Sequence, residues 1–246
     1  MGKEGKTMKK WKKRLLIPGI VLAGAAVAFI IYVSDYYHSE VVVSYGERDG
    51  IQVQAGENYI EFLPGEKEAD TAFVFYPGAK VEYTSYAPLM ERLAGEGIAC
   101  YLMHMPCNLA VLDMNSADEI RREYDYDNWY VGGHSLGGAM AAAYVSKNAE
   151  DYDGLVLLGA YSTKDLSDSG LKVLSIYGSE DGVLNREKYE EDKDNLPAGF
   201  SELEIPGGNH AYYGAYGEQK GDGHARITPE EQQEETAGEI LDWMEE

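Results

Sequence analysis

One serine, one aspartate and one histidine occur along this chain in an order that suits nucleophilic catalysis. Ser135 is the centre of the pentapeptide Gly133-His134-Ser135-Leu136-Gly137, which lies between a short apolar run and an alanine-rich segment. A serine in Gly-x-Ser-x-Gly between a strand and a helix occupies a sharp turn that exposes its hydroxyl. Glycines are needed beside it because a Cβ would clash where strand and helix cross closely. The pattern predicts Ser135 as a nucleophile.

The two other members of a catalytic triad follow later strands. Asp181 comes after the predicted strand 173–177, and His210 comes after the predicted strand 202–205. Carboxyl ends of parallel strands face the ligand-binding edge of a sheet, and Ser, Asp, His is the order expected on such a fold. In a triad the imidazole takes the serine proton, and the carboxylate fixes the tautomer of the imidazole. We therefore predict Asp181 as the acid and His210 as the base.

Several neighbouring side chains are alternatives for these roles. Glu180 is a rival for the acid, and His224 is the second candidate for the base. His104 follows a strand and could line the pocket, whereas His38 belongs to the segment before the domain. His134 lies inside the sharp turn, where we expect it to point away from the reacting side and to support the turn structurally.

A tetrahedral intermediate also needs two preorganised N–H donors for its oxyanion. The first is expected to be the backbone N–H of Leu136, directly after the nucleophile. The second is expected from the loop after the strand 72–76, where Pro77-Gly78-Ala79 lets the backbone approach a substrate. We assign this donor to Ala79, with Gly78 as the alternative.

The elements that carry these residues alternate along the chain. Strands apolar on both faces that alternate with helices predict an α/β fold, with a mostly parallel sheet covered by helices on both faces. The first two strands alternate polar and apolar residues, which favours an antiparallel edge. The predicted strands are 51–55, 59–63, 72–76, 98–103, 129–132, 155–158, 173–177 and 202–205, and the predicted helices are 86–94, 116–124, 138–148, 186–195 and 229–244.

The connection between two of these strands bears on access to the site. Only 14 residues separate the strands 155–158 and 173–177, where related architectures often insert a helical lid. That length leaves no room for a lid domain. We expect an open site, which suits small or surface-displayed substrates.

The first 33 residues have the pattern of a membrane signal. Residues 1–14 hold seven of the 21 Lys and Arg residues, and the next 19 residues, 15–33, carry no charge. That length can cross a bilayer core, and the positive-inside rule places the N-terminus in the cytoplasm. We expect a basic cytoplasmic segment (1–14), an uncleaved transmembrane signal-anchor (15–33), a juxtamembrane stalk (34–50) and an extracytoplasmic domain (51–246). A cleaved signal peptide is the alternative.

Charge and cysteine content narrow the partners. From residue 35 onward the chain has 14 basic and 42 acidic residues, a surface that would repel nucleic acid, so no nucleic-acid partner is expected. Cys100 falls in a predicted buried strand and Cys107 in the loop after it, and a disulfide and two free thiols both remain open. No ligand cluster has metal-binding spacing, so neither a metal nor an organic cofactor is expected.

With these motifs the chain resembles the α/β-hydrolase superfamily, and more narrowly the compact, lidless bacterial group called alpha/beta hydrolase fold-5, related to dienelactone-hydrolase-like proteins. The resemblance runs from about residue 59 to residue 243. It implies Ser135 as nucleophile, Asp181 as acid and His210 as base. Dienelactone hydrolases use a cysteine nucleophile, so their particular activity is not implied here. The matching motifs are Tyr76-Pro-Gly-Ala-Lys-Val81, Met105-Pro-Cys-Asn-Leu-Ala110, Gly132-Gly-His-Ser-Leu-Gly-Gly138, Tyr177-Gly-Ser-Glu-Asp-Gly182, Gly207-Gly-Asn-His-Ala211 and the trailing segment 214–223.

Two departures from the family pattern concern the oxyanion loop and a neighbouring motif. Gly78-Ala79 stands where members of the group more often have two glycines, which would narrow the approach to the loop. Cys107 lies in a motif that usually carries a bulky apolar residue. Neither departure affects the three predicted triad residues.

The sequence thus predicts a membrane-anchored, extracytoplasmic serine hydrolase that cleaves carboxylic esters of small or accessible substrates through an acyl-enzyme. An acyltransferase or a thioesterase with the same triad is a second hypothesis. A third is a non-catalytic surface binding module, suggested by 20 tyrosines against five phenylalanines, with clusters at 124–126 and 212–213. The expected partners are a small-molecule ester and, through the N-terminal helix, the lipid bilayer.

Overall fold

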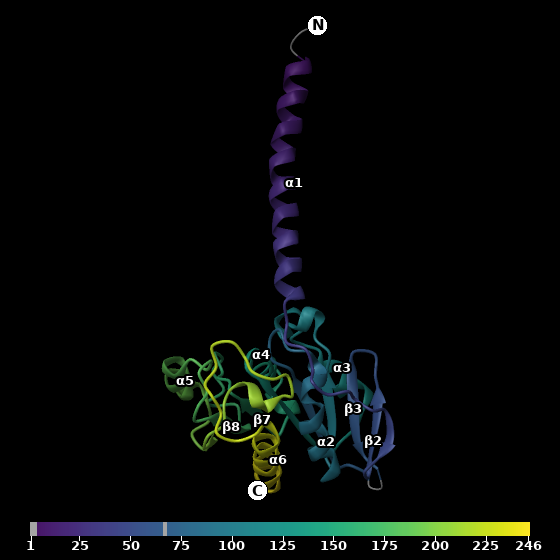
Figure 1. Cartoon of the computed structure of the whole chain (residues 1–246), viewed down its shortest axis with the longest axis vertical. Coiled ribbons are helices and arrows are strands. Elements are labelled where there is room, and N and C mark those ends of the chain that lie inside the picture. Colours follow the sequence, from purple (N-terminus) through teal and green to yellow (C-terminus); the bar gives the residue numbers. More distant parts are fainter. Residues whose placement is uncertain (1–3, 66–67) are drawn as a thin grey trace. The chain divides into compact units, whose positions relative to one another are not determined.

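The computed structural model describes residues 4–65 and 68–246 (Figure 1). Helix α1 (Glu4–Ser34) belongs to one compact unit, and Tyr37–Glu246 form the other. Residues 1–3 of the predicted basic segment lie outside the described residues, as do the side chains of residues 4–17. Within the described part of the chain, no helix combines the length and the apolar character needed to cross a membrane.

The larger unit is built on a sheet whose nine described strands have the order β1-β2-β3-β5-β4-β6-β7-β8-β9. Strands β4 to β9 run parallel, and β1, β2 and β3 form an antiparallel edge that pairs with β5. The predicted fold class and antiparallel edge are therefore confirmed. The strands are β1 (Gly46–Arg48), β2 (Ile51–Ala55), β3 (Tyr59–Pro64), β4 (Thr71–Tyr76), β5 (Ala99–Met103), β6 (Asn128–His134), β7 (Gly154–Leu158), β8 (Lys172–Gly178) and β9 (Ser201–Ile205).

Helices cover both faces of this sheet, which explains why its central strands are apolar throughout. Along β4, Phe73 and Phe75 pack into one core cluster with α2 and α6, whereas Val74 and Tyr76 pack into a second cluster with α3 and α4. Alternate residues of a strand face opposite sides, so each face needs its own apolar residues. The helices are α2 (Ala87–Gly95), α3 (Ala117–Glu123), α4 (Leu136–Val145), α5 (Arg186–Asp192) and α6 (Pro229–Glu245).

The larger unit begins before residue 51, the predicted start of the domain. Much of the segment 34–50, predicted as a stalk, is attached to it through the backbone. The N–H of Tyr37 donates to the carbonyl of Lys80 (2.7 Å), the N–H of Glu40 donates to the carbonyl of Ala215 (2.8 Å), and β1 pairs with β2. The bonds of Tyr37 and Glu40 join the segment to loops that are distant in sequence, so no local pattern indicates them. The pairing of β1 with β2 is a local hairpin across Asp49-Gly50.

The carboxyl ends of β4, β6, β7, β8 and β9 lie at one edge of the sheet because these strands are parallel. The loops that leave this edge carry most of the residues predicted to be functional. The connection from β7 to β8, residues 159–171, is fully described and contains neither a helix nor a strand. A functional site is therefore expected at this edge.

Candidate active site

Ser135 lies between β6 and α4 in a conformation that few residues other than glycine adopt. Its φ and ψ are 53° and −122°, and its N–H donates to the carbonyl of Leu158 in β7 (2.9 Å). A Cβ on Gly133 would lie 2.5 Å from the carbonyl oxygen of Tyr76, and a Cβ on Gly137 would lie closer still. Only glycines fit at these two positions, and the turn stores backbone strain of about 1–3 kcal/mol.

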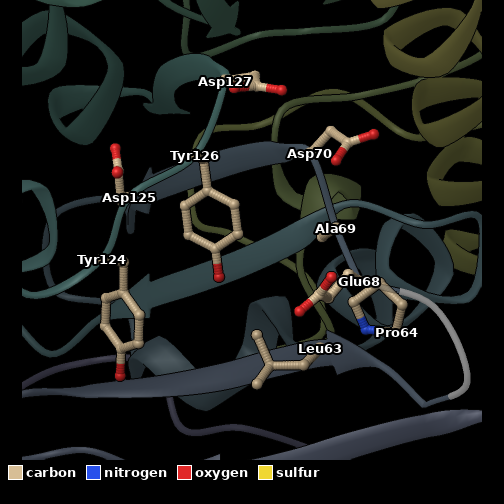
Figure 2. A pocket seen from close by; sticks show the side chains of 9 residues that line it. All are labelled: Leu63, Pro64, Glu68, Ala69, Asp70, Tyr124, Asp125, Tyr126 and Asp127. Atoms are coloured by element: carbon tan, nitrogen blue, oxygen red, sulfur yellow. The ribbon is translucent and has the colours of Figure 1, made fainter.

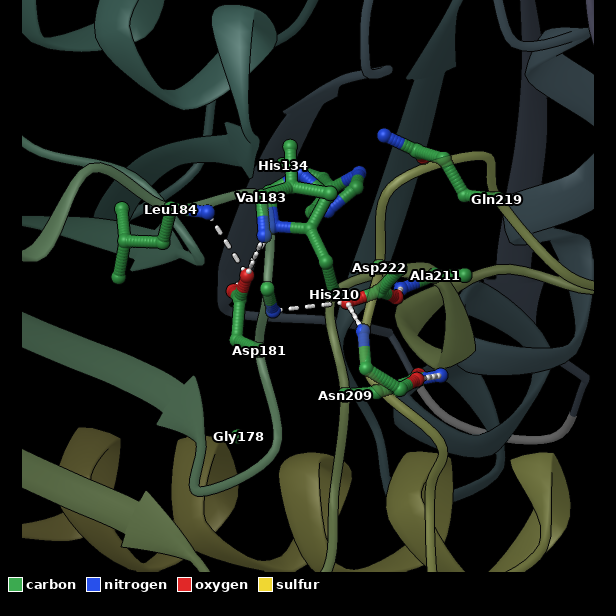
Figure 3. A network of polar contacts seen from close by, with 12 residues as sticks. His134, Gly178, Asp181, Val183, Leu184, Asn209, His210, Ala211, Gln219 and Asp222 are labelled. Carbon is green, nitrogen blue, oxygen red and sulfur yellow. Dashed lines mark hydrogen bonds and ion pairs between the residues drawn. The ribbon is translucent and has the colours of Figure 1, made fainter.

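Asp181 and His210 meet at the carboxyl ends of β8 and β9 (Figure 3). Oδ2 of Asp181 and Nδ1 of His210 are 2.8 Å apart, and both residues are buried. Because the carboxylate can only accept, Nδ1 of His210 carries the hydrogen. Oδ1 of Asp181 accepts from the N–H groups of Val183 (2.9 Å) and Leu184 (2.8 Å). Nε2 of His210 has no hydrogen-bond partner among the described residues, so it is available to accept a proton.

Ser135 and His210 line the same cavity, which has a volume of about 370 Å³. Its lining is mostly apolar, with polar side chains from Ser135, Tyr161, Thr163, Asn185 and His210. A cavity of this kind can hold a small acyl group next to the serine. The other lining residues are Leu136, Ala139, Met140, Gly159, Ala160, Val183 and Leu184.

Gly159, directly after β7, makes room for the Asp–His pair, and the sequence analysis did not predict its role. Its φ is +52°, and an added Cβ would lie 3.0 Å from Nδ1 of His210 and 3.2 Å from Oδ2 of Asp181. Any larger residue would be strained and would crowd the pair. The sequence feature that could have indicated this role is a glycine directly after a buried strand.

The predicted oxyanion donors differ in what they already bind. The N–H groups of Leu136 and Ala79 donate to no other residue within the described ranges. The N–H of Gly78, the predicted alternative, donates to Oη of Tyr86 at 3.1 Å. The donor at Gly78 is therefore engaged, whereas those of Leu136 and Ala79 are free to bind an oxyanion.

A carboxylate outside the predicted triad joins the acid loop to the base loop (Figure 3). Asp222 accepts from the N–H of Gly182 (3.0 Å) and from the N–H of Ala211 (2.8 Å). These donors are the residues directly after Asp181 and His210. Asp222 therefore holds the two loops in register, and it lies in a loop without strand or helix periodicity that could have indicated this role.

The alpha/beta hydrolase family model matches residues 72–234, which is more than half of the chain. The chain belongs to the alpha/beta hydrolase family. No curated protein matches its sequence.

Solved structures similar to this alpha/beta hydrolase share its fold at low sequence identity. A predicted CIB-like hydrolase from Thermoplasma acidophilum is 15% identical, with a TM-score of 0.59 over 78% of this chain and 100% of that chain. MGS-MChE2, an alpha/beta hydrolase enzyme from a sediment metagenome of the Mar Chica lagoon in Morocco, is 18% identical, with a TM-score of 0.60 over 80% and 98%. Est1E from Butyrivibrio proteoclasticus is 14% identical, with a TM-score of 0.56 over 82% and 99%.

His134 does not line the cavity that Ser135 lines, and its ring packs against that of His210. Its ring centroid lies 4.5 Å from that of His210, and its Nδ1 is 2.7 Å from Oη of Tyr86. His134 is buried, and burial, together with the proximity of His210, holds the pKa of His134 well below its usual value. His134 is therefore a neutral, hydrogen-bonded member of the catalytic region.

The other side chains considered for the acid, the base and the pocket make different contacts. Glu180, the rival acid, forms an ion pair with Arg226 (2.9 Å). His104 stacks on Tyr83 with ring centroids 4.5 Å apart and is absent from the lining of the catalytic cavity. His224 is exposed. The structure thus brings Asp181, and none of these side chains, to His210.

The tyrosine cluster at residues 124–126 borders a different hollow, of about 530 Å³ (Figure 2). This hollow shares no lining residue with the catalytic cavity and is bordered by carboxylates. The hydroxyl of Tyr124 donates to Glu61 (2.7 Å), and that of Tyr126 is 2.7 Å from the hydroxyl of Tyr101. These hydroxyls are therefore satisfied within the protein. The lining consists of Leu63, Pro64, Glu68, Ala69, Asp70, Tyr124, Asp125, Tyr126 and Asp127.

The two cysteines are free thiols, Cys100 buried and Cys107 exposed. Burial raises the pKa of the Cys100 thiol, so the group stays protonated. Among residues 4–65 and 68–246, no three His, Cys, Asp or Glu side chains are grouped so as to hold a metal ion.

Substitution of Asp181 tests the acid. We expect Asp181→Asn to lower kcat for p-nitrophenyl acetate by about 10³–10⁴-fold, because the amide no longer favours the Nδ1–H tautomer of His210. Glu180→Gln is the matched control and should change kcat by no more than about twofold, since a partly exposed ion pair contributes little. An equal loss in the two variants would contradict the assignment.

The depressed pKa of His134 predicts how stability depends on pH. Below about pH 6.5 the unfolded chain binds a proton at this histidine that the folded chain does not bind. The free energy of unfolding should therefore be retained above that pH and fall by up to about 1.4 kcal/mol per pH unit below it. Denaturant titrations at several pH values should give a smaller change of unfolding free energy per pH unit for His134→Asn than for the wild type. The exposed-site control His224→Asn should show the same change as the wild type. An equal pH dependence in all three proteins would contradict the prediction.

Proposed function

We propose that this alpha/beta hydrolase is a serine carboxylesterase that acts on esters with small acyl groups. The observation that carries the proposal is the Asp181–His210 pair, in which His210 lines the same cavity as Ser135 and its Nε2 has no hydrogen-bond partner among the described residues. Esterase-like structures among its fold neighbours, such as Est1E, agree with this chemistry. The mostly apolar lining and modest volume of the cavity favour small acyl groups.

Hydrolysis would proceed in two half-reactions. Oγ of Ser135 attacks the acyl carbon while Nε2 of His210 takes the hydroxyl proton. The oxyanion binds to the N–H groups of Leu136 and Ala79. The ester C–O bond breaks, and the alcohol leaves with the proton from His210. Water then attacks the acyl-enzyme with His210 as base, which releases the acid and restores Ser135.

An acyltransferase or a thioesterase would use the same first half-reaction. A transferase differs in the second half-reaction, where an alcohol or a sugar replaces water. The connection 159–171 after β7 carries no helix that would cover the cavity, which gives water access to an acyl-enzyme and favours hydrolysis. A non-catalytic binding module is disfavoured because Asp181 pairs with His210, and His210 lines the same cavity as Ser135.

The esterase proposal predicts a dependence on both serine and chain length. p-Nitrophenyl esters from acetate to palmitate should be hydrolysed with kcat/KM highest for short chains, because longer chains exceed the cavity. Ser135→Ala should abolish turnover and leave the thermal midpoint nearly unchanged. The exposed Ser167→Ala is the matched control and should retain wild-type turnover. Residual activity above a few per cent in Ser135→Ala would contradict the proposal.

We further propose that the chain is anchored in a membrane, with its N-terminus in the cytoplasm and its catalytic domain outside. Residues 15–33 carry no charge, residues 1–14 are strongly basic, and helix α1 runs through the uncharged stretch. An uncharged run of 19 residues matches the length needed for a bilayer core, and the basic flank sets the orientation. The acidic surface of the remaining chain suits a domain that stays in water.

The anchor can be tested in the full chain by placing charge in α1. Leu22→Arg with Val27→Arg should release the protein from carbonate-washed membranes, because each arginine near a span centre costs about 2.5 kcal/mol or more. Leu22→Ile with Val27→Ile should leave the protein in the membrane fraction. Equal retention of both variants, or full release of the wild type, would contradict the anchor.

A further inference from the structure

A buried hydrogen-bonded chain connects the predicted oxyanion loop to the residue before the nucleophile. The N–H of Gly78 lies 3.1 Å from Oη of Tyr86, and that oxygen lies 2.7 Å from Nδ1 of His134. All three residues are buried. Tyr86 lies at the end of the 3₁₀ helix Tyr83–Tyr86, so the chain joins the loop after β4 to the last residue of β6.

The Gly78 end of this chain has a fixed direction. A backbone N–H can only donate, so Oη of Tyr86 accepts from Gly78. The same oxygen also bonds Nδ1 of His134, as donor or as second acceptor according to the tautomer of His134. Burial keeps the pKa of His134 well below its usual value, so the ring is neutral.

The loop packs directly against this pair of side chains. A Cβ on Gly78 would lie 2.8 Å from Nδ1 of His134 and 2.8 Å from Oη of Tyr86. Only a glycine lets the backbone come this close. The peptide that follows carries the free N–H of Ala79, so the orientation of that donor depends on how Gly78 is held.

We propose that Tyr86 and His134 are positioning residues that fix the Gly78–Ala79 peptide and thereby aim the N–H of Ala79 at the oxyanion. The inference rests on the proposed esterase function. Neither side chain lines the catalytic cavity, so both act through the loop. The hydrogen bond to Gly78 also keeps that N–H from competing for the oxyanion. A second glycine at position 79 is then not required, because Gly78 is held by Tyr86 and the N–H of Ala79 binds the oxyanion.

Tyr86→Phe deletes both hydrogen bonds and keeps the ring, which packs on Phe75 with centroids 5.1 Å apart. The N–H of Gly78 then has no partner, and the loop can reorient. We expect kcat to fall about 10–100-fold with KM changed by no more than about twofold, because small misplacements of a transition-state contact have effects of this size. A trifluoromethyl ketone, whose adduct with Ser135 carries an oxyanion, should bind more weakly by a similar factor.

Tyr213→Phe is a closely matched control. Tyr213 is also fully buried and its ring lies 5.4 Å from that of His134, but its hydroxyl has no hydrogen-bond partner among the described residues. Both variants remove a tyrosine hydroxyl oxygen from a ring that lies close to His134. Tyr213→Phe should leave kcat and inhibitor affinity within about twofold of wild type, since no hydrogen bond is lost.

Two results would overturn the inference. One is a loss of kcat in Tyr86→Phe no larger than in Tyr213→Phe. The other is a loss of kcat without a loss of affinity for the ketone. If Tyr86→Phe does not fold, His134→Asn and His134→Leu decide instead. Asparagine keeps a hydrogen-bonding amide near the Nδ1 position, so it should retain more kcat than leucine, and equal losses would overturn the inference.

The proposed esterase function fails in a different way. If it is wrong, wild-type protein neither hydrolyses the esters nor reacts with a fluorophosphonate at Ser135. If only the positioning inference is wrong, the wild type is fully active and Tyr86→Phe resembles it.

Discussion

Strand β6 and helix α4 cross the end of β4 so closely that there is no room for a Cβ at Gly133 or Gly137, the glycines two residues before and after Ser135. This close crossing places the serine at a φ of 53° and leaves its side chain at the mouth of a cavity, beside the start of a helix. The same contact brings the carbonyl of Tyr76, and with it the loop that follows β4, against the turn. The nucleophile and the oxyanion loop are thus positioned by one packing constraint, which explains why glycine is required at 133 and 137.

Other loops are held to this turn by polar contacts from outside the triad. Asp222 ties together the residues that follow the acid and the base, and Gly159 leaves space for the Asp181–His210 bond. His134 packs against His210 on one side and bonds Tyr86 on the other. These contacts reduce the freedom of the loops before any substrate binds, which is how a site can lower a barrier without moving during the reaction.

Sequence patterns predicted the parts of this site that depend on local order. Strands β2 to β9 were each predicted to within a few residues, because apolar runs, glycine turns and alternation are local properties. Tyr86 and His134 are 48 residues apart, so their hydrogen bond leaves no spacing to recognise. The sequence also left Gly78 and Ala79 as alternative donors, and only the hydrogen bond from Gly78 to Tyr86 distinguishes them. The attachment of Tyr37 and Glu40 to distant loops was missed for the same reason.

The central claim is that Ser135 is the nucleophile, activated by the Asp181–His210 pair. The most direct measurement is to label the full chain with a fluorophosphonate and to locate the adduct by peptide mass spectrometry. The account predicts a single adduct on Ser135, and a markedly slower reaction in Asp181→Asn. An adduct on another serine, or no adduct on a folded wild-type protein, would contradict it.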